Sequence, residues 1–230
     1  MDNLEPAAPS GVPATPGFDP AWLVHAAADL LVLAKPAGLL CQPGLGPELA
    51  DALITRVQRQ WPSAQLVHRL DRDTSGLLLV ALSPELHRAL SILFARRKVF
   101  KRYEAVVHGC PSQVAGRIKL ALVKRQNRPP LYGPDPAGKP CRTDWRLLDQ
   151  LSNRATSPHE PTSRLALIPH TGRSHQLRVH LSAIGHPIVG DPLYGPQQRP
   201  AMRLHLHASQ LRFRHPLDGR PLAFHAPCPF

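Results

Sequence analysis

Short apolar runs and amphipathic stretches follow one another along most of the chain. Apolar runs at 30–34 and 76–82 are each closed by a turn or helix-start signal, which predicts buried strands. Residues 47–61 repeat apolar positions every four residues, and Ser83-Pro84-Glu85 precedes a similar stretch that reaches Phe94. A proline in the first turn is typical of a helix start, so we expect a helix in each of these two regions.

The second half of the chain carries the remaining expected elements. These are strands at 103–108 and 165–168, a helix at 174–184 and two strands within 204–227. Residues 124–140 are basic and rich in proline and glycine, and we expect no regular element there. Because strands and helices alternate irregularly, we expect an α+β fold with a mixed, largely antiparallel central sheet flanked by helices and loops.

The first 20 residues differ from the rest in composition. They are rich in proline and alanine, which predicts a flexible tail at 1–20 before one folded domain at 21–230. No apolar run approaches the ~18 residues of a membrane span. The four cysteines form no C-x-x-C pair and the start has no secretory leader pattern. We therefore expect a cytoplasmic protein with free thiols and no membrane partner.

Positive charge exceeds negative charge. Against 16 Asp and Glu stand 28 Lys and Arg, which gives a formal net charge of +12. Such an excess favours a polyanionic partner, and nucleic acid is the first candidate because phosphate contacts dominate its binding. The expected phosphate contacts lie in two basic clusters, one of Arg96, Arg97, Lys98 and Lys101 and the other of Lys124, Arg125 and Arg128.

The candidate chemistry gathers in the nine residues HRLDRDTSG at 68–76, directly before a predicted buried strand. Loops at sheet edges are where sites are commonly built. Asp71 has Arg69 and Arg72 beside it, and opposite charge favours an ionised carboxylate, which can act as a covalent nucleophile. On these residues alone, a turn cap or a surface ion pair is the alternative interpretation of Asp71.

Other site classes fit this chain less well. A kinase is excluded because the aspartate of His-Arg-Leu-Asp is displaced by one position and no Asp-Phe-Gly is present. A glycoside hydrolase with Asp71 and Asp73 as its carboxylate pair is also disfavoured. Two residues this close in sequence would need unusual geometry to flank one glycosidic bond at ~5.5 Å. Ser75 lies in no nucleophile elbow and is expected to be structural. No metal site is expected, because no recognised zinc spacing relates the four candidate histidines His175, His180, His205 and His207.

The nine residues at 68–76 resemble the signature of the RluA-type pseudouridine synthases, which convert uridine in RNA to pseudouridine. Further blocks that resemble the family follow in the expected order, from about Trp22 to the C-terminus. They are KPAG at 35–38, KRYEA at 101–105, TGRSHQLRVHL at 171–181, GHPIVGD at 185–191, and His207-Ala208 with His215-Pro216.

The resemblance implies a role for each matching residue. Asp71 is expected to be the catalytic carboxylate, which attacks either the ribose C1′ or the uracil ring. Tyr103 is expected to stack on the uracil and to help remove the C5 proton, and Arg173 to hold Asp71 in a salt bridge. Arg69 is expected to fill the space left by the flipped nucleotide. The other expected substrate contacts are His68, Leu177, Arg72 and Thr74. The reaction is an isomerisation, so no cofactor is expected.

The length of the chain bears on the substrate. Only about 20 residues precede the first predicted strand, so the accessory RNA-binding domain of many relatives has no counterpart here. The short architecture resembles the dual-specificity members, which modify a tRNA anticodon loop and a 23S rRNA hairpin. We expect a monomer that recognises a compact RNA hairpin. The alternatives are a synthase for a single tRNA or rRNA substrate and an RNA-binding protein of the same fold without catalysis.

Overall fold

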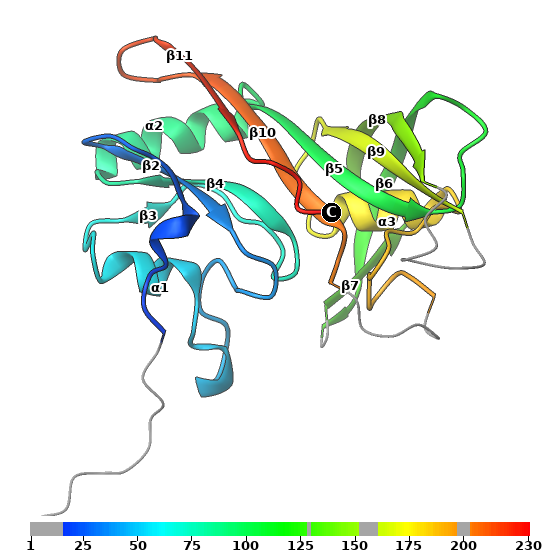
Figure 1. Ribbon diagram of the computed structural model, residues 1–230, viewed down its shortest axis with the longest axis horizontal. Helices are drawn as coiled ribbons and strands as arrows, with labels where there is room; N and C mark the ends of the chain where they lie inside the picture. The colour runs from blue at the N-terminus through cyan, green and yellow to red at the C-terminus, as the bar shows by residue number, and fades with distance from the viewer. Residues whose placement is uncertain (1–15, 128–129, 152–160, 197–202) are drawn as a thin grey trace, which may run out of the picture.

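A mixed β-sheet runs through the whole molecule (Figure 1). The computed structural model describes residues 16–127, 130–151, 161–196 and 203–230, so most of the tail expected at 1–20 lies outside the described residues. The described strands are β1 (Leu23–Ala26), β2 (Leu30–Lys35), β3 (Gln65–Leu66), β4 (Ser75–Ala81), β5 (Phe100–His108), β6 (Ala115–Asn127), β7 (Pro130–Pro134), β8 (Lys139–Leu151), β9 (Thr162–Pro169), β10 (Leu206–Arg214) and β11 (Pro221–His225).

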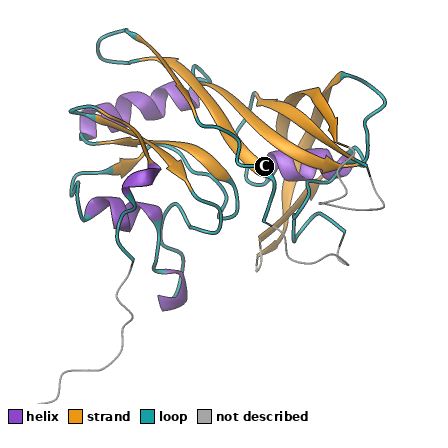
Figure 2. Cartoon of the chain, in the orientation of Figure 1, coloured by secondary structure: helices purple, strands orange, loops and turns teal. Residues whose placement is uncertain are grey.

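Few helices accompany this sheet (Figure 2). Within the described ranges they are α1 (Leu53–Gln58), α2 (Pro84–Ala95) and α3 (Gln176–Ala183), with 3-10 turns at Pro20–Trp22 and Pro47–Leu49. The strand order is β1-β2-β4-β10-β5-β9-β8-β6-β7, with β11 on β10 and β3 on β4. Of the described strand pairs, only β4 and β10 run parallel. The expected mixed, largely antiparallel α+β fold is confirmed.

The continuous apolar runs of β2 and β4 are explained by helices on both faces of this part of the sheet. One face packs against α1, where Leu53 and Val57 meet Leu31 and Leu78. The other face packs against α2, in a separate core cluster. All seven residues of β4 are buried. Strands buried on both sides need apolar residues at successive positions, which is why no alternation is visible in the sequence.

A second lobe forms around α3. Leu177 and Leu181 of this helix pack against β5 and β9 through Val107, Leu165 and Leu167. Strands β5 and β10 pair with each other and join the two lobes, as Figure 1 shows. The junction between the lobes therefore lies along β5 and beside the start of α3.

Two expectations about the elements were wrong. The region 124–140 is regular, because β6 and β7 form a hairpin and β8 begins at Lys139. Prolines are tolerated there since β7 pairs only with β6 among the described strands and so is an edge strand. The stretch 47–61 is also no single helix. It divides into a 3-10 turn and the short α1, which begins after Ala52.

Candidate active site

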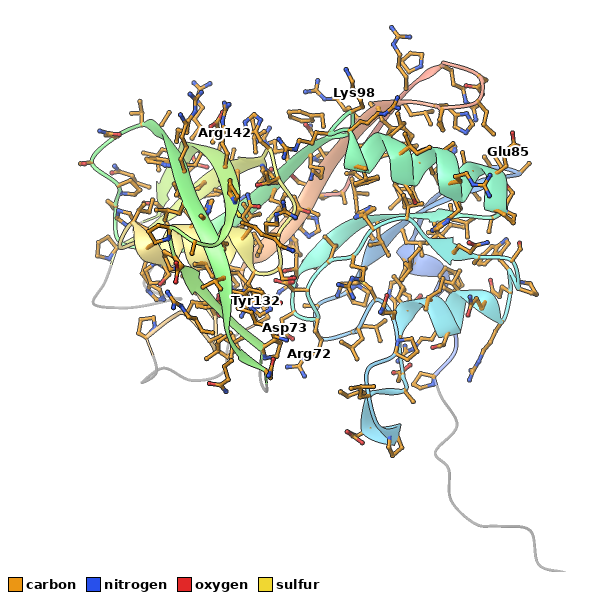
Figure 3. All side chains as sticks on the ribbon, turned by 180° about the vertical axis from the view of Figure 1, so that it is seen from behind. Arg72, Asp73, Glu85, Lys98, Tyr132 and Arg142 are labelled. Atoms are coloured by element: carbon orange, nitrogen blue, oxygen red, sulfur yellow. The ribbon has the colours of Figure 1, made fainter. Side chains whose placement is uncertain are left out.

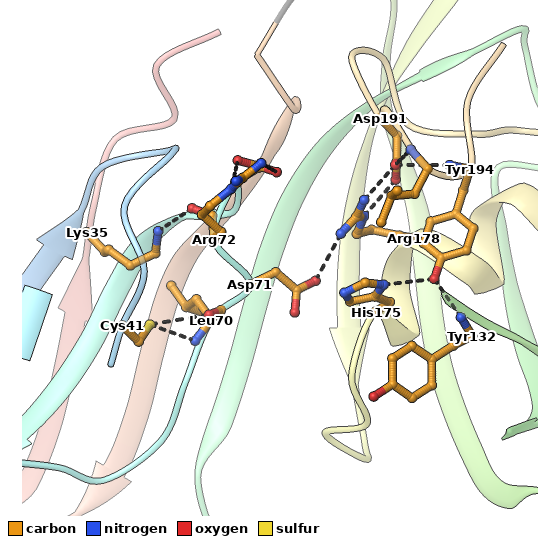
Figure 4. A network of polar contacts seen from close by, with 12 residues as sticks. Lys35, Cys41, Leu70, Asp71, Arg72, Tyr132, His175, Arg178, Asp191 and Tyr194 are labelled. Atoms are coloured by element: carbon orange, nitrogen blue, oxygen red, sulfur yellow. Dashed lines mark hydrogen bonds and ion pairs between the residues drawn. The ribbon is translucent and has the colours of Figure 1, made fainter. Parts of the chain in front are cut away.

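Asp71 lies in a tight turn between β3 and β4, at the junction of the two lobes. The amide of Thr74 donates to the carbonyl oxygen of Asp71 (3.2 Å) and closes this turn. The side chain of Asp71 is 26% exposed. Figure 4 shows its carboxylate pointing from the β2 and β4 side toward α3. A partly open carboxylate at a lobe junction can be reached by a ligand without being fully solvated.

The residue before Asp71 is clamped by a thiol. Cys41 Sγ donates to the carbonyl oxygen of Leu70 and accepts from its amide, both at 3.3 Å. Burial raises the pKa of Cys41, so the thiol stays protonated and can donate.

The residue after Asp71 is held by its carbonyl oxygen. The Arg72 carbonyl accepts from Lys35 Nζ at 2.7 Å and from the amide of Gly38 at 3.0 Å. Lys35 is 1% exposed and donates two further hydrogen bonds, to the carbonyls of Pro36 and Leu39. Burial lowers the pKa of Lys35 to about 8. The turn that carries Asp71 is therefore fixed on both sides by residues 35–41.

Arg178 is the guanidinium that reaches Asp71. Its Nη1 lies 3.5 Å from Oδ2 of Asp71, while Nε and Nη2 donate to Asp191 at 2.8 and 2.7 Å. The guanidinium also lies over the ring of Tyr194, 5.1 Å from its centre. Arg178 is thus oriented from two sides before any ligand arrives.

The expectation that Arg173 pairs with Asp71 was wrong. Arg173 is exposed in the turn before α3, and its amide donates to Oε1 of Gln176 (3.2 Å). Arg178 lies inside α3, whose buried side faces the junction. Arg173 and Arg178 both belong to the block TGRSHQLRVHL at 171–181. The block therefore indicated correctly where the partner of Asp71 lies, but the wrong arginine was chosen within it. That choice depends on where the helix begins, which the block alone does not reveal.

Two tyrosines and a histidine extend the network beyond Arg178. The hydroxyl of Tyr194 accepts from the amide of Tyr132 (2.9 Å) and lies 2.8 Å from Nδ1 of His175. The hydroxyl keeps its own proton while it accepts, and it can donate that proton to Nδ1 of a neutral His175 ring. Burial lowers the pKa of His175, which favours this neutral form. Figure 4 shows its ring beside Asp71. Neither tyrosine was expected at the site from the sequence.

Tyr103 on β5 contacts the core clusters of both lobes. Burial raises the pKa of its hydroxyl well above the ordinary value, and the Asp71 carboxylate adds to the shift. The phenol therefore stays protonated, which suits a stacking platform better than a phenolate base. Leu177 is 7% exposed and belongs to one of the clusters that Tyr103 touches, so both residues expected at the base pocket lie near one another.

Two residues expected to bind substrate have partners within the fold. Nε2 of His68 accepts from the amide of Leu79 (3.1 Å), and its ring stacks on Phe94 with 4.5 Å between centres. Thr74 is 3% exposed and closes the Asp71 turn. Their contacts with substrate therefore remain predictions, although both residues also have partners within the fold. Arg69 and Arg72 are exposed at the turn, with Arg72 paired to Asp73 (3.1 Å).

The Ser-Gly pair after the turn marks where β4 and β10 come close together. A Cβ atom on Gly76 would lie 2.4 Å from the carbonyl oxygen of Ala208, and φ of Gly76 is +113°. No other residue fits this close approach. Ser75 is buried, with its hydroxyl 2.9 Å from Nδ1 of His207. The expectation that Ser75 is structural is confirmed.

The histidines considered for a metal site each have a different neighbour. His180 lies against Thr143, His205 stacks on Phe230, and His207 meets Ser75. Among the described residues, no three His, Cys, Asp or Glu side chains gather as metal ligands would.

None of the described helices is long and apolar enough to cross a membrane.

The basic clusters lie at different places. Figure 3 shows Lys98 at the upper edge of the molecule, whereas Tyr132, Arg72 and Asp73 lie together lower down. Arg96, Arg97 and Lys98 are exposed at the end of α2. Lys101 is half-buried, and burial lowers its pKa. In the other cluster Lys124 is exposed and Arg125 pairs with Asp135 (3.2 Å) on the β6–β7 hairpin, while Arg128 lies outside the described residues.

Comparison with known proteins places this geometry in one family. The family model described as RNA pseudouridylate synthase matches residues 29–183. The dual-specificity RNA pseudouridine synthase RluA of Escherichia coli K12 is 42% identical over 214 residues, which are 91% of this chain and 94% of that protein. The RluA protein of Pasteurella multocida is 41% identical over 94% of this chain and 97% of its own length.

Solved structures give the same result. Human RNA Pseudouridylate Synthase Domain Containing 1 superposes with a TM-score of 0.75 at 32% sequence identity, over 90% of this chain and 83% of that one. Human RNA Pseudouridylate Synthase Domain Containing 4 has a TM-score of 0.70 at 23% identity, over 91% of this chain and 89% of that one, and shows the shared fold.

Proposed function

The chain belongs to the RNA pseudouridylate synthase family, and on this premise we propose that it isomerises one uridine of a structured RNA to pseudouridine at Asp71. The observation that carries the proposal is the geometry around this carboxylate. Cys41 and Lys35 fix the backbone on the two sides of Asp71, and Arg178 faces its carboxylate. The carboxylate also helps to raise the pKa of the Tyr103 hydroxyl, which stays protonated.

The reaction requires a nucleotide outside its stack. Extrusion costs a few kcal/mol, and an exposed arginine beside the turn can fill the gap and offset part of that cost. Arg69 is exposed next to Asp71 and suits this role. The flipped uracil then lies between the Asp71 carboxylate and the face of Tyr103.

Each residue has a distinct task in this mechanism. Asp71 attacks the ribose C1′ or the uracil ring, and the bond between C1′ and N1 breaks. The base rotates, C5 bonds to C1′, and the covalent bond to Asp71 breaks, which frees the carboxylate. The proton on C5 is lost while N1 gains one, so the atoms of substrate and product are the same. Arg178 keeps the carboxylate aimed, and Tyr103 supports the rotating ring by stacking.

For the substrate, we propose a tRNA anticodon loop and a 23S rRNA hairpin. The E. coli relative is named a dual-specificity RNA pseudouridine synthase, and this chain covers 94% of it. The β6–β7 hairpin reaches this site, since the amide of Tyr132 donates to the hydroxyl of Tyr194. Such RNAs are recognised by shape and splayed bases. We further propose that the protein works in the cytoplasm as a monomer without a cofactor.

The test is to incubate the protein with bulk tRNA and rRNA from a host that lacks it and to map pseudouridine by carbodiimide-dependent primer extension. We expect new modification with the wild type and none with Asp71→Asn. Asp73→Asn is the matched control, because Asp73 lies in the same turn and pairs with the exposed Arg72. It should retain most of the activity. RNA binding without modification by the wild type would instead favour the binding protein, and modification of one RNA alone would favour a single-substrate synthase.

A further inference from the structure

A groove of about 630 Å³ lies at the start of β5 and along the β10–β11 hairpin. Its cations are Lys98, Arg212 and Arg214, and its apolar floor includes Phe100 and Leu222. None of the residues that line it is acidic. This combination of positive charge and an apolar floor belongs to no part of the Asp71 site.

Strand alternation explains why the cations face outward. In the β10 register Arg212 lies opposite Phe100 of β5 and Ala223 of β11, and Arg214 lies opposite Pro221. The intervening Leu211 and Phe213 are buried against the α2 cluster. Arg212 and Arg214 are both exposed, two residues and roughly 7 Å apart along the strand.

The positive charge of this surface is not neutralised within the described residues. Arg212 lies over the ring of Phe100, 4.1 Å from its centre, and Arg214 donates to the carbonyl of Gly219 (3.1 Å). No described carboxylate forms an ion pair with Arg212, Arg214 or Lys98. Arg96 and Arg97, which precede Lys98 at the end of α2, are exposed as well. A polyanion is the partner that such uncompensated charge favours.

The groove and the catalytic turn lie at different places on the molecule. Phe100 lies at the start of β5, three residues or roughly 10 Å along the strand from Tyr103. Figure 3 also shows Lys98 at the upper edge and Asp73 well below it. The nucleotides around the flipped uridine therefore do not fill the groove. Whatever binds there is a separate segment.

We propose that this groove binds the phosphate backbone of an RNA segment that flanks the target hairpin. The inference rests on the proposed function, which makes RNA the substrate. Cations spaced along one strand track phosphates, and the apolar floor can accept a base face or a sugar. An acidic protein would also complement the positive charge of the groove. RNA is the preferred partner because the proposed function already makes RNA the substrate of this enzyme.

The test compares two substrates that differ only in length. One is the minimal stem-loop that carries the target uridine, and the other is the full-length tRNA or a long rRNA fragment. Arg212→Glu/Arg214→Glu should raise KM for the long RNA about tenfold or more and leave kcat unchanged, with little effect on the stem-loop. The log–log salt slope for the long RNA should become shallower by about 1.5. Arg212→Gln/Arg214→Gln serves if the charge reversal prevents folding.

The matched control is Lys119→Glu/Arg146→Glu, which makes the same change of charge at exposed cations of β6 and β8. It should affect both RNAs less than the groove variant affects the long one. Equal losses in the two variants would show a general effect of net charge and overturn the proposal. A groove variant that binds the long RNA as tightly as the wild type would also overturn the proposal. The same holds if that variant has lost binding to an acidic protein instead. A wild type that modifies neither RNA would instead contradict the proposed function.

Discussion

The thiol of Cys41 brackets the backbone of Leu70, with Sγ 3.3 Å from both its amide nitrogen and its carbonyl oxygen. Leu70 directly precedes Asp71 and is itself buried. The side chain of Cys41 thus satisfies two backbone groups that no neighbouring strand reaches at this point. Since the pair fixes the direction in which the chain enters the turn, it also sets the position of the Asp71 carboxylate.

Replacing Cys41 should therefore affect turnover. Cys41→Val has a similar volume but removes both hydrogen bonds, and we expect kcat to fall about tenfold because small misplacements of reacting groups are costly. KM should change little. Cys41→Ser keeps a donor and an acceptor and should recover most of kcat. Unfolding free energy should fall by about 1–3 kcal/mol in the valine variant, so rates are measured well below its unfolding midpoint.

Cys141→Val is the control for this series. Cys141 is also a buried thiol that donates to a backbone carbonyl, that of Lys139 (3.2 Å), but it lies on β8. Its replacement should leave kcat unchanged. A valine at position 41 that turns over like the wild type, or an equal loss at position 141, would contradict the role of the Cys41 clamp.

Lys35 should give turnover a pH dependence. The protonated amine donates to three carbonyls, those of Pro36, Leu39 and Arg72, and a neutral amine has only two hydrogens to offer. Its pKa is lowered to about 8 by burial, against the opposing effects of Cys41, Asp73 and Asp71. We expect kcat to fall as pH rises through about 8. Lys35→Met should be slower at every pH and flat through this range, with the same RNA as substrate for both proteins.

Whereas kcat should fall as pH rises through about 8, the stability contribution of Lys35 should rise with pH. Because the pKa of Lys35 is lower in the folded chain than its ordinary 10.5, the unfolded chain binds more protons between about pH 8 and 10.5. The free energy of unfolding therefore gains a contribution that rises with pH in this window, and it is absent in Lys35→Met. Urea unfolding across the window tests this. A loss of kcat that follows a loss of stability would mean that the effect is global unfolding and not deprotonation of Lys35.

Arg178→Met should damage both activity and stability. It leaves the Asp191 carboxylate, which is 0% exposed, without its bidentate partner. Removing one member of a buried pair costs about 3–5 kcal/mol. Arg178→Lys keeps the charge but not the planar fork, and we expect partial recovery of stability and little recovery of kcat. Arg117→Met, which breaks an exposed pair with Asp144, should change little by comparison.

The fold was predictable where the pattern is local. The strands β2 and β4 are continuous apolar runs because helices cover both of their faces, and the start of α2 carries a serine cap whose hydroxyl accepts from the amide of Leu86 (3.1 Å). The β6–β7 hairpin was missed because its regularity comes from cross-strand partners and not from its proline-rich sequence.

The site was predictable only in part for a similar reason. Asp71 and Tyr103 stand in recognisable motifs, and the turn and the strand bring them to the junction. Cys41 and Lys35 act on backbone atoms of residues about 30 positions away or more. Lys35 stands in the KPAG block at 35–38, but the block does not reveal which carbonyl its amine binds.

His68 was expected to contact the substrate but has partners within the fold, and acid titration can decide its role. Burial lowers its pKa to about 3, so the unfolded chain binds more protons than the folded one between about pH 6.5 and 3. Stability should therefore fall as pH falls through this window. His68→Gln keeps an acceptor for the amide of Leu79 but does not titrate, and its stability should decline less steeply. Its kcat and KM at neutral pH should match the wild type. A large rise in KM with unchanged acid stability would instead return His68 to the substrate site.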